Sequence, residues 1–181
     1  MKFYFFVFLF FLAACSNFSK KNRFSQYYNI DSLLNIQIKN LSKSQNLNKV
    51  IYWEDDYEEK KINSSLINWE KELNIFKQID LNKPSNLDAY SVLLENNSIE
   101  YKKFLEDEGI VSLKIIFHRQ GNPKKIFSTE IKQNLLFNSI KEYSLDFDTS
   151  GILIKYSLED TQKSIFNDTL EYALYATVQW N

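Results

Sequence analysis

The sequence contains few residues that could support nucleophilic or metal chemistry. It has one cysteine, Cys15, and one histidine, His118. A catalytic nucleophile is usually activated by a histidine or a tuned lysine, and a zinc site needs several His or Cys ligands. Because Leu113, Ile115 and Phe117 share the inward side of a predicted strand, we expect His118 to point outward near the strand end. A single outward histidine favours neither an enzyme nor a metal site.

Two groups of carboxylates invite a catalytic or metal assignment. Asp146 and Asp148 lie two residues apart and share a strand face. Two carboxylates placed in this way could act as a general acid and a general base. A strand that runs into a turn has the same pattern. The acidic run Glu54–Glu59 lacks the glycine and ligand spacing of a calcium loop, and two lysines follow it, which indicates a solvated turn. No nucleophile-elbow, P-loop or dinucleotide-binding motif occurs. We therefore expect no catalytic residue, no cofactor and no metal.

Cys15 follows a short apolar segment at the amino terminus. Lys2 supplies a positive charge, Phe3 to Leu12 form an apolar stretch of about ten residues, and two alanines precede the cysteine. This pattern is typical of a secretory signal, and the stretch is too short to cross a bilayer core of about 30 Å as a helix. One cysteine also forms no internal disulfide.

The stretch Leu12-Ala13-Ala14-Cys15 resembles the lipobox of bacterial lipoproteins. In that class the cysteine receives a diacylglycerol, the leader is cut before it, and the new amino terminus is acylated by a fatty acid such as palmitate. The resemblance implies that residues 1–14 are a signal peptide and that Cys15 is the lipid attachment site. The alternative is an ordinary signal peptide with an incidental cysteine. More than one acyl chain gives stable anchoring, at about 0.8 kcal/mol per buried CH₂.

The residues after Cys15 indicate in which membrane such a lipoprotein would be anchored. In the lipoprotein class, Asp at the next position favours the inner membrane, and here the residue is Ser16. The segment 17–23 carries no acidic run of the kind that some lineages use to send lipoproteins to the cell surface. The resemblance therefore implies an outer-membrane protein that faces the periplasm. Residues 15–25 are polar after the cysteine and are predicted to form a tether.

Two stretches have the apolar spacing of amphipathic helices. Residues 26–44 carry apolar side chains at steps of three and four, and a second helix is predicted from Ser64 or Ser65 onward, before Pro84. The two stripes consist of Tyr27, Ile30, Leu34, Ile38 and Leu41 in the first helix, and Leu66, Trp69, Leu73 and Phe76 in the second.

The rest of the chain alternates with the period of β-strands. A hairpin is predicted from 50–53 and 58–62 around Asp55-Asp56, and from residue 88 onward apolar residues alternate with polar ones through several short turns. The alternating sets are Tyr90, Val92 and Leu94; Leu135, Phe137, Tyr143, Leu145 and Phe147; Ile152, Ile154, Tyr156 and Leu158; and Leu170 to Trp180. The pattern predicts a single α+β domain over 26–181, an antiparallel β-meander of about six or more strands with two amphipathic helices packed on one face.

One stretch of the predicted second helix and the loop after it is motif-like. Trp69, Glu72-Leu73, Phe76, Asp80 to Pro84 and Tyr90 form a pattern that resembles a group of uncharacterised Gram-negative outer-membrane lipoproteins, over about residues 1–100. That group implies no activity. Core packing and a helix stop account for most of these positions. Asn82 and Lys83 are left over, and we regard them as candidate contacts to a partner.

The net charge of the protein bears on the class of partner that it could bind. The net charge of -1 gives no electrostatic footprint for nucleic acid. We expect a membrane-anchored, periplasm-facing lipoprotein that acts as a non-catalytic interaction or envelope-assembly module. The alternative is a carrier or chaperone for hydrophobic cargo, a lipid or a lipoprotein, held in a curved-sheet cavity. A mostly apolar cavity of about 300 Å³ or more between helices and sheet would favour the carrier, and a packed interface would favour the module.

Overall fold

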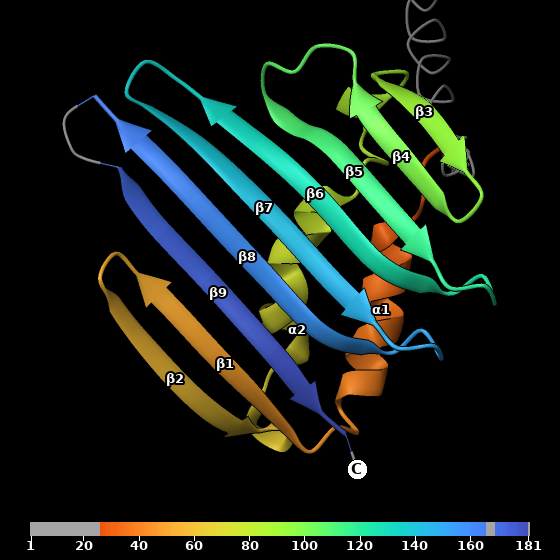
Figure 1. Cartoon of the computed structure of the whole chain (residues 1–181), viewed down its shortest axis with the longest axis vertical. Coiled ribbons are helices and arrows are strands. Elements are labelled where there is room, and N and C mark those ends of the chain that lie inside the picture. Colours follow the sequence, from red (N-terminus) through yellow and green to blue (C-terminus); the bar gives the residue numbers. More distant parts are fainter. Residues whose placement is uncertain (1–25, 166–168, 181) are drawn as a thin grey trace, which may run out of the picture.

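The computed structural model describes residues 26–165 and 169–180 (Figure 1). The predicted signal peptide, the tether and Cys15 lie outside the described residues, as does Asn181. The helices are α1 (Ile30–Leu41) and α2 (Trp69–Leu73), and three short 3-10 turns flank or follow α2, at Ser64–Leu66, Asn74–Ile79 and Pro84–Asn86.

Nine antiparallel strands form one sheet in the order β2-β1-β9-β8-β7-β6-β5-β4-β3. The strands are β1 (Asn46–Trp53), β2 (Asp56–Asn63), β3 (Tyr90–Glu95), β4 (Ser98–Lys103), β5 (Gly109–Phe117), β6 (Pro123–Gln133), β7 (Phe137–Phe147), β8 (Leu153–Ser164) and β9 (Leu170–Gln179). β3 to β9 follow one another as a meander, and the β1–β2 hairpin joins the sheet beside β9. The predicted α+β class and antiparallel sheet are confirmed.

The first hairpin turns one residue earlier than the sequence suggested. Trp53 pairs with Asp56, so the two turn residues are Glu54 and Asp55 rather than Asp55 and Asp56. Glu54 has a φ of 54°, in the left-handed region that two-residue hairpins use because its twist matches that of the strands.

Helix α1 is shorter than the predicted 26–44. The Asn29 side chain caps it by accepting a hydrogen bond from the Ser32 amide at 2.7 Å. The preceding Tyr27 is held by a tertiary contact, since its amide donates to Asn82 Oδ1 at 3.0 Å. The apolar stripe is confirmed, because Ile30, Leu34 and Leu41 are fully buried.

The predicted continuous second helix is wrong. Ser64 and Ser65 lie in a separate 3-10 turn, and the side chain that caps α2 is Asn68, which accepts from the Lys71 amide at 3.0 Å. The break has a physical reason: the Ser64 hydroxyl is buried, donating to the Leu41 carbonyl and accepting from Trp69 Nε1. Leu66, assigned to the apolar stripe, is 80% exposed. The other stripe positions, Trp69, Leu73 and Phe76, are buried as predicted.

Four predicted strand positions also differ. Leu135 lies in the β6–β7 turn and is exposed. Ile152 precedes β8, and Leu153 takes the buried position because a register shift lets it pair with Phe147. Val92 and Leu94 are both exposed on β3, which is an edge strand. In contrast, Tyr143, Leu145 and other inward positions of β7 to β9 are buried as predicted.

Helical segments and strands share one hydrophobic core. Ile30 and Leu34 of α1 and Leu73 of α2 belong to the same buried cluster as Leu113 and Leu145 of the sheet. A buried glutamine ties α1 to the β7–β8 turn: Gln37 Nε2 donates to the Gly151 carbonyl at 3.0 Å, and its Oε1 accepts from the Leu153 amide at 2.9 Å. Because both polar ends of this side chain are satisfied, its burial carries no unpaired-group penalty.

Candidate functional site

A groove of about 520 Å³ lies between the α2 segment and strands β1, β2, β8 and β9. We call it the α2 groove. More than half of its walls are hydrocarbon. They are formed by Ile62, Leu66, Ile67, Ile75, Leu158 and Leu174, with Lys49, Asn68, Lys71, Glu72 and Tyr172 as the polar part. The size falls within the roughly 300–1,000 Å³ of typical ligand pockets.

A partly buried ion pair forms one wall of the α2 groove. Lys49 Nζ of β1 lies 2.7 Å from Glu72 Oε1 of α2, and the two side chains are 16% and 19% exposed. The hydroxyl of Tyr156, on β8, donates to the same carboxylate oxygen at 2.8 Å. A carboxylate removed from water is costly unless it is paired and hydrogen-bonded, and Glu72 has both kinds of partner. The ion pair thus fixes α2 against two strands.

The same carboxylate affects two neighbouring tyrosines. Burial, and then the charge of Glu72, raise the pKa of Tyr156 well above its ordinary value. The same two causes raise the pKa of Tyr172. Both hydroxyls therefore stay protonated. That of Tyr156 donates to Glu72, whereas Tyr172 lines the groove.

A second tyrosine–carboxylate pair lies next to the first. Tyr143 donates to Glu130 Oε2 at 2.6 Å, and Lys132 Nζ lies 3.3 Å from the other oxygen of Glu130. Phe76 packs edge-on against the rings of both Tyr143 and Tyr156, with centroids 6.0 and 5.5 Å away. Burial, then the hydrogen bond and charge of Glu130, raise the pKa of Tyr143. Phe76 thus packs against the tyrosine of each pair.

A third polar cluster continues along the same face of the sheet. Lys141 pairs opposite Glu130 on β6 and opposite Asp160 on β8, so the three side chains share a face. Lys141 Nζ lies 3.3 Å from Asp160 Oδ2, and Ser139 donates to Asp160 Oδ1 at 2.7 Å. These carboxylates are all engaged by lysines or hydroxyls. The arrangement holds structure and offers polar contacts, and the hydrocarbon walls of the groove offer a surface for apolar ligand.

Asn82, one of the two candidate partner contacts, has partners within the domain. Its Oδ1 accepts from the Tyr27 amide, and its Nδ2 donates to the carbonyls of Tyr27 and Tyr28 at 3.3 Å and to Asp80 Oδ1 at 2.9 Å. Asp80 in turn accepts from the Asp31 amide at 2.9 Å. The Asp80-to-Asn82 part of the motif thus fixes the start of α1. The predicted contact of Asn82 with a partner stays a prediction.

Lys83 is more exposed than its neighbour. Its Nζ donates to the Gln78 carbonyl at 2.9 Å, close to the end of the 3-10 turn. Asn82 and Lys83 are not among the residues that line the α2 groove. Their predicted role therefore belongs to a different part of the surface from the groove.

The remaining candidates for chemistry are apart from one another. His118 lies after β5 and is half-buried rather than exposed, with Nε2 3.3 Å from the Phe147 carbonyl. Asp146 pairs with Lys125 at 3.2 Å, whereas Asp148 Oδ1 accepts from the amides of Ser150 and Ile152, which confirms its place in a turn. Within residues 26–165 and 169–180, no group of three or more His, Cys, Asp or Glu could hold a metal ion.

The α2 groove and its ion pair were not predicted from the sequence. One signal was available: Lys49 stands at the same parity as Leu47 and Ile51, so a lysine occupies an inward position of β1. Its partner could not be found from spacing, because Glu72 lies on a helix 23 residues later.

Comparison of the chain with protein-family models, with curated proteins and with solved structures gave no match. In the described part of the chain, no helix is both long enough and apolar enough to cross a membrane.

Proposed function

We propose that the protein is a lipoprotein anchored through Cys15 in the outer membrane, facing the periplasm, and that its domain binds a hydrophobic cargo in the α2 groove. The cargo class is an acyl chain, from a lipid or an acylated protein. The α2 groove supports this proposal, because it is mostly apolar and its volume of about 520 Å³ lies in the roughly 300–1,000 Å³ range of ligand pockets.

We further propose that the two helical segments together cover one face of the sheet and that the groove is the place where this cover is incomplete. Elsewhere the contact between helices and sheet is filled, as the full burial of Leu34 and Leu73 supports. An acyl chain would lie between Ile67 and Ile75 on one side and Leu158 and Leu174 on the other.

The polar part of the groove suits the head of such a ligand. Lys71 is exposed at the rim, and the hydroxyl of Tyr172 is a protonated donor. A carboxylate or ester would find a cation and a donor beside the apolar part of the α2 groove, a common arrangement in sites that orient amphipathic ligands. The expectation of an interaction or assembly module stays a prediction alongside this proposal.

The proposal is tested by titrating the purified protein with a fluorescent palmitate analogue. Wild type should bind it, and Leu174→Gln, which places an amide in the α2 groove, should weaken binding at least about tenfold, by the loss of apolar burial. Leu93→Gln, on exposed β3, is the matched control and should bind like wild type. Thermal unfolding of each variant checks that it is folded. Absence of binding by wild type, or equal binding by Leu174→Gln, would contradict the carrier function.

A further inference from the structure

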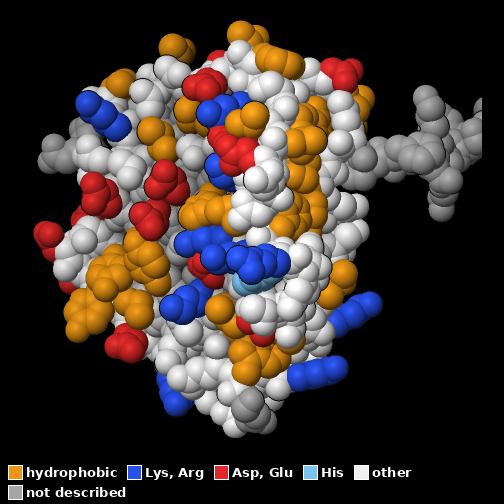
Figure 2. Space-filling model, turned by 45° about the vertical axis from the view of Figure 1, so that its right-hand side comes forward, with side chains coloured by type: hydrophobic (Ala, Val, Ile, Leu, Met, Phe, Trp, Pro, Cys, Tyr) orange, Lys and Arg blue, Asp and Glu red, His pale blue; other side chains and the backbone are white. Residues whose placement is uncertain are grey.

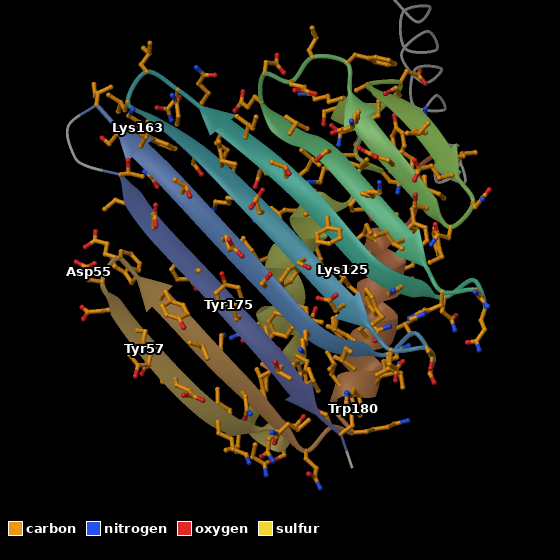
Figure 3. All side chains as sticks on the ribbon, in the orientation of Figure 1. Asp55, Tyr57, Lys125, Lys163, Tyr175 and Trp180 are labelled. Carbon is orange, nitrogen blue, oxygen red and sulfur yellow. The ribbon has the colours of Figure 1, made fainter. Side chains whose placement is uncertain are left out.

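The two ends of the sheet differ in the side chains that their turns expose. At one end lie the β1–β2, β4–β5, β6–β7 and β8–β9 connections and the residues that enter β3. We call this end the apolar end. In Figure 1 the strands run diagonally and this is their upper-left end, which the labels of Asp55 and Lys163 mark in Figure 3. Its exposed large hydrophobic residues are Trp53, Leu87, Phe104, Leu105, Leu135 and Leu136, with Ile165 beside them.

The three turns that join neighbouring strands at the opposite end are polar, although the connection that leaves β2 at this end carries the exposed Leu66. These turns are 96–97 (Asn-Asn), 118–122 (His-Arg-Gln-Gly-Asn) and 148–151 (Asp-Thr-Ser-Gly), and Trp180 marks this end in Figure 3. None of the large hydrophobic residues exposed in the described part of the chain lies in these three turns. Leu135, at the apolar end, is 93% exposed. Single exposed hydrophobic residues are common on protein surfaces. A group of them in successive turns at one end of a sheet is unusual and indicates an interaction surface.

The chain enters the domain at the apolar end. Gln26 Nε2 donates to Asp88 Oδ1 at 2.8 Å, and Tyr27 donates through its hydroxyl to the Asn86 carbonyl at 2.9 Å. Asp88 follows the exposed Leu87 directly and precedes β3. Residues 15–25 therefore connect Cys15 to this end, and eleven residues reach at most about 40 Å when extended.

The charges at the apolar end are mostly negative. Glu54 and Asp55 form the β1–β2 turn, and Glu106, Asp107 and Glu108 lie in the β4–β5 connection, where Asp107 pairs with Lys103 at 3.1 Å. Figure 2 shows hydrophobic side chains at the upper end of the molecule, with acidic side chains among them. An anionic lipid surface would repel these carboxylates, whereas a zwitterionic surface would accept the apolar turns without that cost.

We propose that the apolar end lies against a zwitterionic lipid surface, with Phe104, Leu105, Leu135 and Leu136 inserted among the head groups. The domain would then stand on the membrane with its strands directed away from it, rather than moving freely on its tether. The lipid anchor proposed at Cys15 holds the domain close enough for this contact, so the inference rests on that part of the proposed function. It does not depend on the α2 groove.

The test uses the full-length protein, purified from membranes and reconstituted in phosphatidylcholine vesicles. One cysteine is introduced by Leu135→Cys at the apolar end or by Ser150→Cys at the opposite end, and is labelled with the polarity-sensitive fluorophore NBD. Emission at position 135 should shift to the blue and be quenched by spin-labelled lipid, while emission at position 150 should do neither. Equal responses at the two positions would overturn the proposal.

The parent protein separates failure of the anchor from failure of the contact. An acylated Cys15 has no thiol, so the parent should take up no label. Labelling of the parent would refute the anchor and leave the contact to be judged from the difference between positions 135 and 150.

Two further arms test the chemistry of the surface. Phe104→Ser with Leu105→Ser should reduce quenching at position 135 at least about threefold, because both side chains lose apolar area. Val92→Ser with Leu93→Ser, exposed on β3, is the matched control and should leave quenching unchanged. Addition of phosphatidylglycerol should lower quenching at position 135. Unchanged quenching in the first variant, or stronger quenching with the anionic lipid, would contradict a zwitterionic contact of these turns.

Discussion

The side chain of Glu72 connects three elements of the domain, and nothing in the sequence around it indicates this. It lies on α2, pairs with Lys49 of β1, and accepts the hydroxyl of Tyr156 from β8. Loss of its carboxylate would leave a largely buried lysine without a partner, which is costly even where the intact pair contributes little. At the scale of single residues, the site is built from tyrosine hydroxyls that must stay protonated to donate to carboxylates.

The protonation of a buried tyrosine predicts how stability depends on pH. Burial, followed by the neighbouring Tyr27, raises the pKa of Tyr90 to about 12. An unfolded tyrosine has a pKa of about 10. Because the folded value is the higher one, the stabilisation is complete below pH about 10 and is lost as the pH rises through about 12. Tyr90 donates to the Ile110 carbonyl, a bond that the ionised form cannot make.

Denaturant unfolding at pH 8 and pH 11 measures this effect. The free energy of unfolding of wild type should fall between the two pH values, and Tyr90→Phe should show a smaller fall, although it is less stable at pH 8. Tyr57→Phe, on an exposed ring, is the control and should fall as wild type does. An identical fall in Tyr90→Phe would show that this hydroxyl is not protected by burial.

At the scale of elements, sequence periodicity predicted the buried positions well where one element packs against a continuous surface. The stripe of α1 and the inward positions of β7 and β9 are examples, since Leu34, Leu145 and Val178 are all buried. Periodicity failed where a tertiary hydrogen bond determines the backbone conformation. Ser64 reads as a helix cap, but its hydroxyl is used by Ser44 and Trp69, so the helix starts four residues later, after Asn68.

Because the predicted second helix is interrupted, we expect substitutions of two leucines in its apolar stripe to have different effects on the free energy of unfolding. Leu73→Ala should lower the free energy of unfolding by about 2–5 kcal/mol, because the side chain is fully buried and its loss leaves a cavity. Leu66→Ala should change it by less than about 0.5 kcal/mol. Urea unfolding of both variants checks the pair. A small effect at Leu73 would mean that α2 is not part of the core.

At the scale of the whole molecule, the α2 groove could not be predicted from the sequence. Its walls come from β1, β2, β8 and β9 and from the α2 segment, so Ile62 and Leu174 meet only after the sheet has formed. Each residue alone reads as an ordinary apolar position. In contrast, the anchor is a local pattern, and it remains a sequence prediction because Cys15 lies outside the described residues.

The anchor is tested at this scale by cell fractionation. Cys15→Ala should move the protein out of the membrane fraction, because the thiol that would carry the diacylglycerol is lost. Cys15→Ser, of nearly the same size, should behave in the same way. Retention of both variants in the membrane fraction would contradict lipid attachment at Cys15.

The place of β9 in the sheet has a consequence for the synthesis of the protein. β9 lies between β1 and β8, and Asn46 pairs with Gln179 across most of the chain. The β1–β2 hairpin can form early, but the β1 edge stays without a partner until β9 has been synthesised. Such distant pairing slows folding and leaves an open strand edge for aggregation in the meantime. A nascent chain stalled before β9 would thus be a natural client for a chaperone.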